Sequence, residues 1–235
     1  MKIPCHMIMS VDGRLISKYW SPLYNASSSV TEVYEAADAK LSADGWIVGR
    51  KTMAEYGADV VEEKEPMEGH KTMQTNTFIG KREGRPLAVV FDIQGRLHYK
   101  SPTLPSGEHI VAVLGSHVTR AYQKELEEIG VSYIMRTPGS KLEETQSALK
   151  HLEHDFNVKH MLLEGGAITC GNFLQMGLVD ELSMIVYPGL DGESGHPSVI
   201  ECQGVVEPLK KNRLELIDCE TVGSGYVWLR YNIHR

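Results

Sequence analysis

The stretch LLEGGAITCGNF, residues 162–173, has the residue types of an anion-binding turn. An apolar run is followed by Glu164, then by Gly165 and Gly166, and then by a helix-like segment. Glycines leave room for a ligand to approach the backbone, and the free amides of a helix start favour phosphate. The amides concerned here are those of Gly165, Gly166, Ala167, Ile168 and Thr169. The alternative is a glycine-rich turn that only packs tightly against a sheet.

Two other turns carry groups that suit phosphate. VGRKT places Gly49 at a strand end and Thr52 at a predicted helix N-cap. SHVTR places two hydroxyls and a guanidinium at the start of a helix, where they would hold a phosphate monoester such as a 2′-phosphate; these residues are Ser116, Thr119 and Arg120. The alternative for each turn alone is a capped helix without a ligand. Three such turns on one sheet edge favour an extended ligand with several phosphates, and a dinucleotide fits, although GxGxxG and P-loop motifs are absent.

Two carboxylates lie in the same turns. Glu164 would not itself attract a phosphate, but it could accept paired N–H groups from an amino-pyrimidine-like ring. Asp12, in SVDG, follows the first predicted strand. For Glu164 the alternative is a carboxylate bonded to nearby amides, and for Asp12 it is an ordinary Asp-Gly turn. Both are candidates for delivering a proton, and the sequence does not choose between them.

The elements that must position these turns alternate between strand and helix. Strands are predicted within residues 2–10, 44–49, 85–92, 109–115, 131–135, 158–165 and 179–188, and helices within 29–41, 52–57, 119–130, 141–156 and 167–177. Ser29 with Glu32, and Thr52 with Glu55, have the spacing of capping boxes. The alternation predicts an α/β fold with a mostly parallel central sheet.

The remaining segments differ from this pattern. Residues 57–85 are polar and predict an excursion or mobile loop. Residues 212–222 and 225–233 predict a C-terminal antiparallel hairpin. No repeat or linker interrupts the pattern, so we expect a single domain over residues 1–235.

Composition narrows the class of protein. The chain has 235 residues, a net charge of −7 and no basic block, which argues against a nucleic-acid or anionic-membrane surface. No apolar run reaches a bilayer span, and the start is too polar for a secretory signal, so we expect a cytoplasmic protein. The four cysteines form no CxxC pair and the ten histidines form no HxH or HExxH motif. We therefore expect neither a disulfide framework nor a metal site.

Three stretches resemble a known family. MSVDGRL, ADGWIVGRKT and MLLEGGAITCGNFLQMGLVDELSMIVYPGLDG are similar to the reductase domain of the riboflavin-biosynthesis deaminase–reductases, within the dihydrofolate-reductase-like superfamily. The third stretch is the most specific, because its acid-Gly-Gly, Gly-Leu-Val-Asp-Glu and Pro-x-x-x-Gly elements occur in order. The deaminase signature is absent, and AEYGADVVEE replaces an Asp-Asp-Pro-x-Leu stretch that family members often carry.

The resemblance implies a dihydrofolate-reductase-like fold, NADPH as hydride donor and a homodimer. By position, it implies that Thr52 and the run from Gly166 contact NADPH and that Glu164 contacts substrate. Lys40 stands where the family often has an arginine for the substrate phosphate, and a lysine could hold that phosphate as a point charge.

The expected reaction is hydride transfer to a small heterocyclic or phosphosugar substrate, such as 5-amino-6-(5-phosphoribosylamino)uracil or a diamino-pyrimidine analogue. One alternative is a dihydrofolate or pterin reductase, which would need an acid on the first helix; the acids available there are Glu32, Glu35 and Asp38. The other alternative is a non-catalytic module that senses NADPH.

Overall fold

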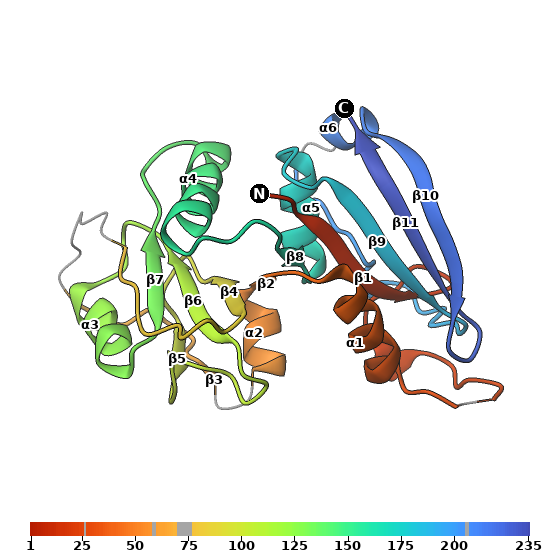
Figure 1. Cartoon of the computed structure of the whole chain (residues 1–235), viewed down its shortest axis with the longest axis horizontal. Coiled ribbons are helices and arrows are strands. Elements are labelled where there is room, and N and C mark those ends of the chain that lie inside the picture. The colour runs from red at the N-terminus through yellow and green to blue at the C-terminus, as the bar shows by residue number, and fades with distance from the viewer. Residues whose placement is uncertain (26, 58–59, 70–76, 205–206) are drawn as a thin grey trace. The chain divides into compact units, whose positions relative to one another are not determined.

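The computed structural model describes residues 1–25, 27–57, 60–69, 77–204 and 207–235, which form two compact units (Figure 1). Unit 1 comprises Met1 and Asp44–Met161, and unit 2 comprises Lys2–Ala43 and Leu162–Arg235. The single domain predicted over residues 1–235 stays a prediction.

Within its described residues, unit 1 contains four parallel strands, and a helix follows three of them in the chain. In hydrogen-bonded order the strands are β2 (Gly45–Gly49), β4 (Leu87–Phe91), β6 (His109–Leu114) and β7 (Ser132–Met135). The helices are α2 (Arg50–Tyr56), α3 (Arg120–Ile129) and α4 (Lys141–Asp155). The core includes Leu114 of β6, Tyr122 and Leu126 of α3 and Met135 of β7, all at most 1% exposed. These strands are mostly apolar because both faces of such a strand are buried.

The polar segment of residues 57–85 contains an element that the sequence pattern missed. β3 (Val60–Glu62) pairs antiparallel with β5 (Leu97–Tyr99), and Glu62 lies opposite Leu97. A strand of three residues is too short for alternation to show. Residues 58–59 and 70–76 of the predicted excursion lie outside the described residues.

Unit 2 contains three parallel strands joined to a hairpin. In hydrogen-bonded order, the two hairpin strands and the three parallel strands are β10 (Arg213–Val222), β11 (Tyr226–His234), β9 (Glu181–Tyr187), β1 (Pro4–Ser10) and β8 (Leu162–Leu163). β8, β1 and β9 run parallel, whereas β11 and β10 run antiparallel, so the predicted C-terminal hairpin is confirmed. The helical segments are η1 (Ser17–Tyr19), α1 (Val30–Leu41), α5 (Ala167–Gln175) and α6 (Glu207–Lys210).

Hydroxyl side chains cap three helices. Ser29 and Glu32 form the predicted capping box of α1, Ser140 caps α4, and the Thr119 hydroxyl accepts from the Tyr122 amide at the start of α3. The predicted cap at Thr52 is wrong. β2 runs directly into α2 with extended Gly49 as the N-cap, so Thr52 lies inside the first turn.

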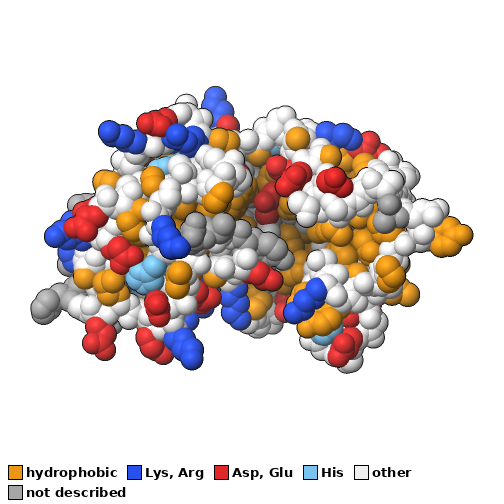
Figure 2. Space-filling model, turned by 90° about the horizontal axis from the view of Figure 1, so that it is seen from below, with side chains coloured by type: hydrophobic (Ala, Val, Ile, Leu, Met, Phe, Trp, Pro, Cys, Tyr) orange, Lys and Arg blue, Asp and Glu red, His pale blue; other side chains and the backbone are white. Residues whose placement is uncertain are grey.

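The structure also bears on three kinds of site that the sequence argues against: a membrane span, a metal site and a basic surface for nucleic acid. Within the described ranges, no helix combines the length and apolarity that a bilayer span requires. Nor do the described His, Cys, Asp and Glu side chains gather in threes that would suit a metal ion. On the coloured part of the face in Figure 2, basic side chains lie interspersed with acidic ones and form no continuous basic patch.

Candidate functional site

The glycine pair joins β8 to α5 in unit 2. Gly165 has φ +114°, which favours glycine, and its peptide bond to Gly166 is cis. Gly166 is the extended N-cap of α5, and no side chain of the described residues caps this helix. Helix α1 differs, because the Ser29 hydroxyl accepts from its first turn. The first amides of α5 therefore remain available to an acceptor from outside the helix.

Gly171, inside α5, lies in close contact with another segment of the protein. A Cβ at Gly171 would collide with the carbonyl oxygen of Glu201 and would lie 3.0 Å from Sγ of Cys202. The Glu201 amide also donates to the carbonyl of Ala167 over 3.1 Å. Gly171 thus serves the packing of α5 against the segment around residue 201.

Glu164 lies between β8 and the glycine pair. Burial raises the pKa of Tyr34 well above its ordinary value, and the charge of Glu164 adds to that rise. The hydrogen bond with Cys5 and burial raise the pKa of Cys170 on α5, and the charge of Glu164 adds to that rise. Tyr34, from α1, donates its hydroxyl to the carbonyl of His6 over 2.9 Å. The charge of Glu164 therefore acts on side chains of both α1 and α5.

A buried histidine lies beneath Tyr34, and the sequence patterns did not identify it. The rings of His6 and Tyr34 are 4.5 Å apart, and Nδ1 of His6 lies 2.8 Å from the Ser183 hydroxyl. Nε1 of Trp228 donates to the same hydroxyl, which leaves the Ser183 proton free to bond Nδ1. Burial lowers the pKa of His6 to about 4, so the ring is neutral at pH 7. A single polar residue within the apolar strand IPCHMIM was the available signal.

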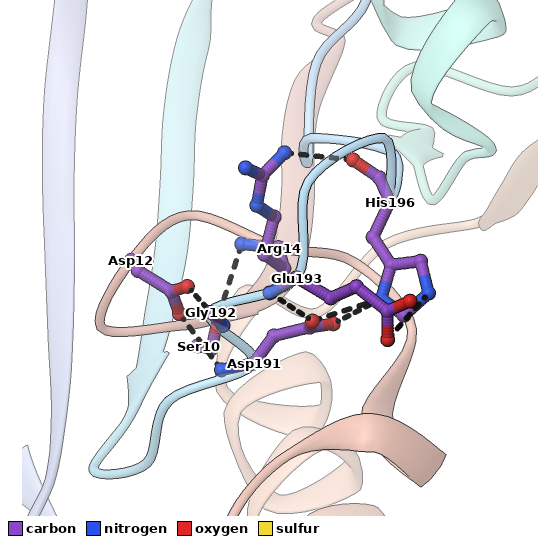
Figure 3. Close-up of polar contacts among 7 residues, drawn as sticks. All are labelled: Ser10, Asp12, Arg14, Asp191, Gly192, Glu193 and His196. Carbon is purple, nitrogen blue, oxygen red and sulfur yellow. Dashed lines mark hydrogen bonds and ion pairs between the residues drawn. The ribbon is translucent and has the colours of Figure 1, made fainter.

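Asp12 holds the turn after β1 to the loop after β9 (Figure 3). Its Oδ1 accepts from the Ser10 hydroxyl over 2.6 Å and from the Asp191 amide over 3.1 Å, and its Oδ2 accepts from the Gly192 amide over 2.8 Å. These bonds, that from Ser10 first, lower the pKa of Asp12 to about 2. Asp12 is therefore ionised at neutral pH, which suits a group that holds a loop better than one that donates a proton.

The loop after β9 carries an aspartate–histidine pair that the sequence patterns missed (Figure 3). The Asp191 side chain is fully buried, and its two oxygens lie 2.8 and 2.9 Å from Nδ1 of His196. Nε2 of His196 lies 3.5 Å from Glu193, and the ring stacks on Tyr19 with centroids 4.1 Å apart. Arg14 donates to the His196 carbonyl over 2.7 Å. Such a pair fixes the tautomer and orientation of an imidazole.

Lys40 is engaged by the C-terminal hairpin. Its ammonium lies 2.7 Å from Glu220 of β10 and 5.3 Å from the ring centroid of Trp228. The side chain is 56% exposed, so this ion pair is weak and a phosphate could compete for it. The proposed role of Lys40 toward a substrate phosphate stays a prediction.

The other predicted cofactor residues belong to unit 1. Thr119 is buried and serves as a cap, and Arg120 makes a two-pronged ion pair with Glu127 of the same helix, with N–O distances of 2.6 and 2.9 Å. Phosphate binding by Ser116, Thr119 and Arg120 would therefore have to compete with bonds inside α3. Gly49 and Thr52 lie at the junction of β2 and α2. The assignment of these residues to a cofactor stays a prediction.

Comparison with known proteins gives one family over nearly the whole chain. The model described as the RibD C-terminal domain matches residues 1–228. A similar fold occurs in a pyrimidine reductase-like protein from Corynebacterium diphtheriae, with 19% identity, a TM-score of 0.66 and a match that covers 100% of this chain and 92% of that chain. Another occurs in Acinetobacter baumannii RibD, with 20% identity, a TM-score of 0.66 and a match that covers 99% of this chain and 58% of that chain. The riboflavin biosynthesis reductase Rib7 from Saccharomyces cerevisiae also matches, with 14% identity, a TM-score of 0.61 and coverage of 99% of this chain and 90% of that chain. The chain thus spans little more than half of the Acinetobacter protein. The predicted dihydrofolate-reductase-like α/β fold is confirmed.

Proposed function

Because the chain belongs to the RibD C-terminal domain family, we propose that it is an NADPH-dependent reductase. Its substrate would be a small heterocycle or phosphosugar, with 5-amino-6-(5-phosphoribosylamino)uracil or a diamino-pyrimidine analogue as the first candidates. The cofactor would supply a hydride to a C=N or carbonyl carbon of that substrate. The residues of this chain would bind and orient the cofactor and the substrate, and they would deliver a proton to the substrate.

The turn from Glu164 into α5 carries this proposal. Gly165 adopts a conformation that favours glycine, and α5 begins without a side-chain cap among the described residues. Amides of this kind, with the positive end of the helix dipole, bind phosphate groups. We assign the run from Gly165 to Thr169 to the pyrophosphate of the cofactor.

Glu164 and Asp12 have separate roles in this proposal. Glu164 would accept N–H groups of the substrate ring and would take part in proton delivery. Asp12, with its pKa near 2, would hold residues 191–192 in the conformation that the substrate meets. Lys40 would attract the substrate phosphate once its weak pair with Glu220 opens.

The pterin-reductase alternative loses one of its three candidate acids on α1. Glu32 closes the capping box at the start of that helix, so its carboxylate already has hydrogen-bond partners. The sensor alternative differs in predicting cofactor binding without turnover. Steady NADPH oxidation with a panel of pyrimidines and pterins separates these readings.

A pair of glycine variants tests the assignment of α5. Gly166→Val should abolish NADPH binding in a thermal-shift titration while the protein stays folded, because a side chain blocks approach to the amides. Gly171→Ala is the matched control, since that glycine contacts the Glu201 backbone. It should lower the melting temperature and leave NADPH binding intact. Normal NADPH binding by folded Gly166→Val would contradict the assignment.

The C-terminal hairpin offers a surface for the proposed homodimer. β10 lies at one end of the strand order and exposes three large apolar residues: Leu214 (51%), Leu216 (53%) and Ile217 (41%). Leu214 and Leu216 lie opposite Ile233 and Tyr231 of β11, so the apolar face continues across the hairpin. A second copy of the same hairpin would bury this face, which makes it our candidate dimer interface.

A further inference from the structure

Two arginines of unit 1 follow the ends of neighbouring parallel strands. Arg50 comes directly after β2, and Arg96 follows β4 by five residues. Gly49 and Phe91, the last residues of those strands, are partners in the ladder. The two arginines therefore belong to the carboxyl edge of the sheet in unit 1, where α/β folds bind their ligands.

Both guanidinium groups meet the same carboxylate. Oε1 of Glu62 lies 2.8 Å from Nε of Arg50 and 3.3 Å from Nη2 of Arg96. Gln94 bridges the pair from another side, with its Oε1 3.0 Å from Nη1 of Arg50 and 3.4 Å from Nη1 of Arg96. The three charged side chains are only 22%, 18% and 24% exposed for Arg50, Arg96 and Glu62, so solvent screens the cluster weakly.

The carboxylate leaves part of this cation pair unsatisfied. Nε of Arg50 is buried and, among the described residues, donates to no acceptor with hydrogen-bond geometry, despite its short distance to Glu62. Asp92 is the other acid nearby; its Oδ2 accepts from the amides of Arg96 and Leu97, and burial raises its pKa. A phosphate has three acceptor oxygens and matches a pair of guanidinium forks better than one carboxylate does.

Backbone bonds hold Glu62 at this position. The β3–β5 ladder sets Glu62 opposite Leu97, and the next amide, of Glu63, donates to the carbonyl of Arg96 over 2.9 Å. Nε of Arg96 donates in return to the carbonyl of Glu63 over 2.6 Å. The short strand that the sequence pattern missed thus brings an acid to the arginine pair.

We propose that Glu62 sets the cofactor preference of this chain, because its carboxylate takes the place between Arg50 and Arg96 that the 2′-phosphate of NADPH would otherwise take. The inference rests on the proposed reductase function, and it deepens that function by naming the residue that discriminates NADPH from NADH. A carboxylate at such a place favours a ribose 2′-hydroxyl, whereas arginines favour a 2′-phosphate. This chain has both the carboxylate of Glu62 and the two arginines at that place. The 2′-phosphate of NADPH must therefore displace Glu62, whereas NADH, which has no such phosphate, need not.

The direct test is the ratio of the dissociation constants for NADPH and NADH, measured by calorimetry on the full chain. Glu62→Gln keeps the shape and removes the charge, so NADPH should bind at least about tenfold tighter while NADH changes little. Glu63→Gln is the matched control, because its contact with Arg96 is through a backbone carbonyl that the substitution retains. It should leave the ratio unchanged.

Arginine variants provide independent evidence. Arg50→Gln in the Glu62→Gln background should remove the gain in NADPH affinity, and 2′,5′-ADP should show the same order of affinities as NADPH. Arg120→Ala tests the rival assignment of the 2′-phosphate to Ser116, Thr119 and Arg120. Under the present inference Arg120 stays paired with Glu127, so the ratio should not change. An unchanged ratio in Glu62→Gln with both cofactors still bound, or a ratio that changes only with Arg120, would overturn the inference. Failure of the wild type to bind either cofactor would instead overturn the proposed function.

Discussion

The carboxylate of Asp12 bonds the amide of Gly192 over 2.8 Å, which joins the turn after β1 to the loop after β9 across 180 residues of sequence. A second bond, from the Asp191 amide, brings the buried Asp191–His196 pair into the same structure. One acid of the SVDG turn thereby fixes a loop whose own residues carry an imidazole and two carboxylates. An ordinary Asp-Gly turn would bond only its own backbone.

Asp12→Asn tests this connection through pH. The pKa of Asp12 is lowered to about 2 from 3.8, so its ionised form stabilises the fold above about pH 4 and that contribution is lost as pH falls toward 2. The variant should melt below the wild type at pH 7, and the difference should shrink between pH 4 and pH 2. Thermal unfolding followed by circular dichroism measures it, with Glu193→Gln as control. A difference that does not change with pH would contradict the assignment.

His6 should make the fold sensitive to mild acid. Its pKa falls to about 4 in the folded chain from 6.5, so the unfolded chain binds the proton first and stability is lost as pH falls from 6.5 to 4. Burial lowers the pKa of His109 in unit 1 to about 4 as well, so His109 adds a similar loss of stability in mild acid. His6→Asn should reduce the slope of unfolding free energy against pH by up to about 1.4 kcal/mol per pH unit. Urea unfolding at several pH values measures the slope, and equal slopes would refute the prediction.

The apolar face of the hairpin should control assembly. Leu216→Lys places a charge within the exposed apolar face of β10 and should convert a dimer into a folded monomer. Glu215→Lys is the control, because neighbouring strand residues point to opposite faces. Light scattering coupled to gel filtration reports the mass of each variant. A dimeric Leu216→Lys would place the interface elsewhere.

Much of the fold was predictable because the apolar segments are long and regularly separated. The parallel strands of unit 1 and the capping box at Ser29 follow directly from local pattern. β3 was missed because three residues show no period, and the cap of α2 was misplaced because Gly49 takes the N-cap position directly at the strand end. Local sequence could not distinguish these cases, since the outcome depends on where the strand stops.

The candidate site was predictable in part, and the missing part is formed by distant residues. The Glu164-Gly-Gly turn stands out in the sequence because a plain turn needs only one glycine and no acid. The partners of Asp12 in the loop at 191–192 and the meeting of Arg50 with Glu62 depend on tertiary structure. No spacing along the chain encodes contacts of that kind.

We propose that Glu164 serves the substrate and that the glycine pair beside it serves the cofactor. Glu164→Gln tests this directly, because it removes the negative charge with little change in packing. A carboxylate and a phosphate charge about 4 Å apart repel each other by about 4 kcal/mol at an effective dielectric of 20. We expect NADPH to bind equally or more tightly, and kcat/KM for the substrate to fall about a hundredfold or more. A lower melting temperature with NADPH affinity and kcat/KM both intact would contradict the account and assign Glu164 to structure alone.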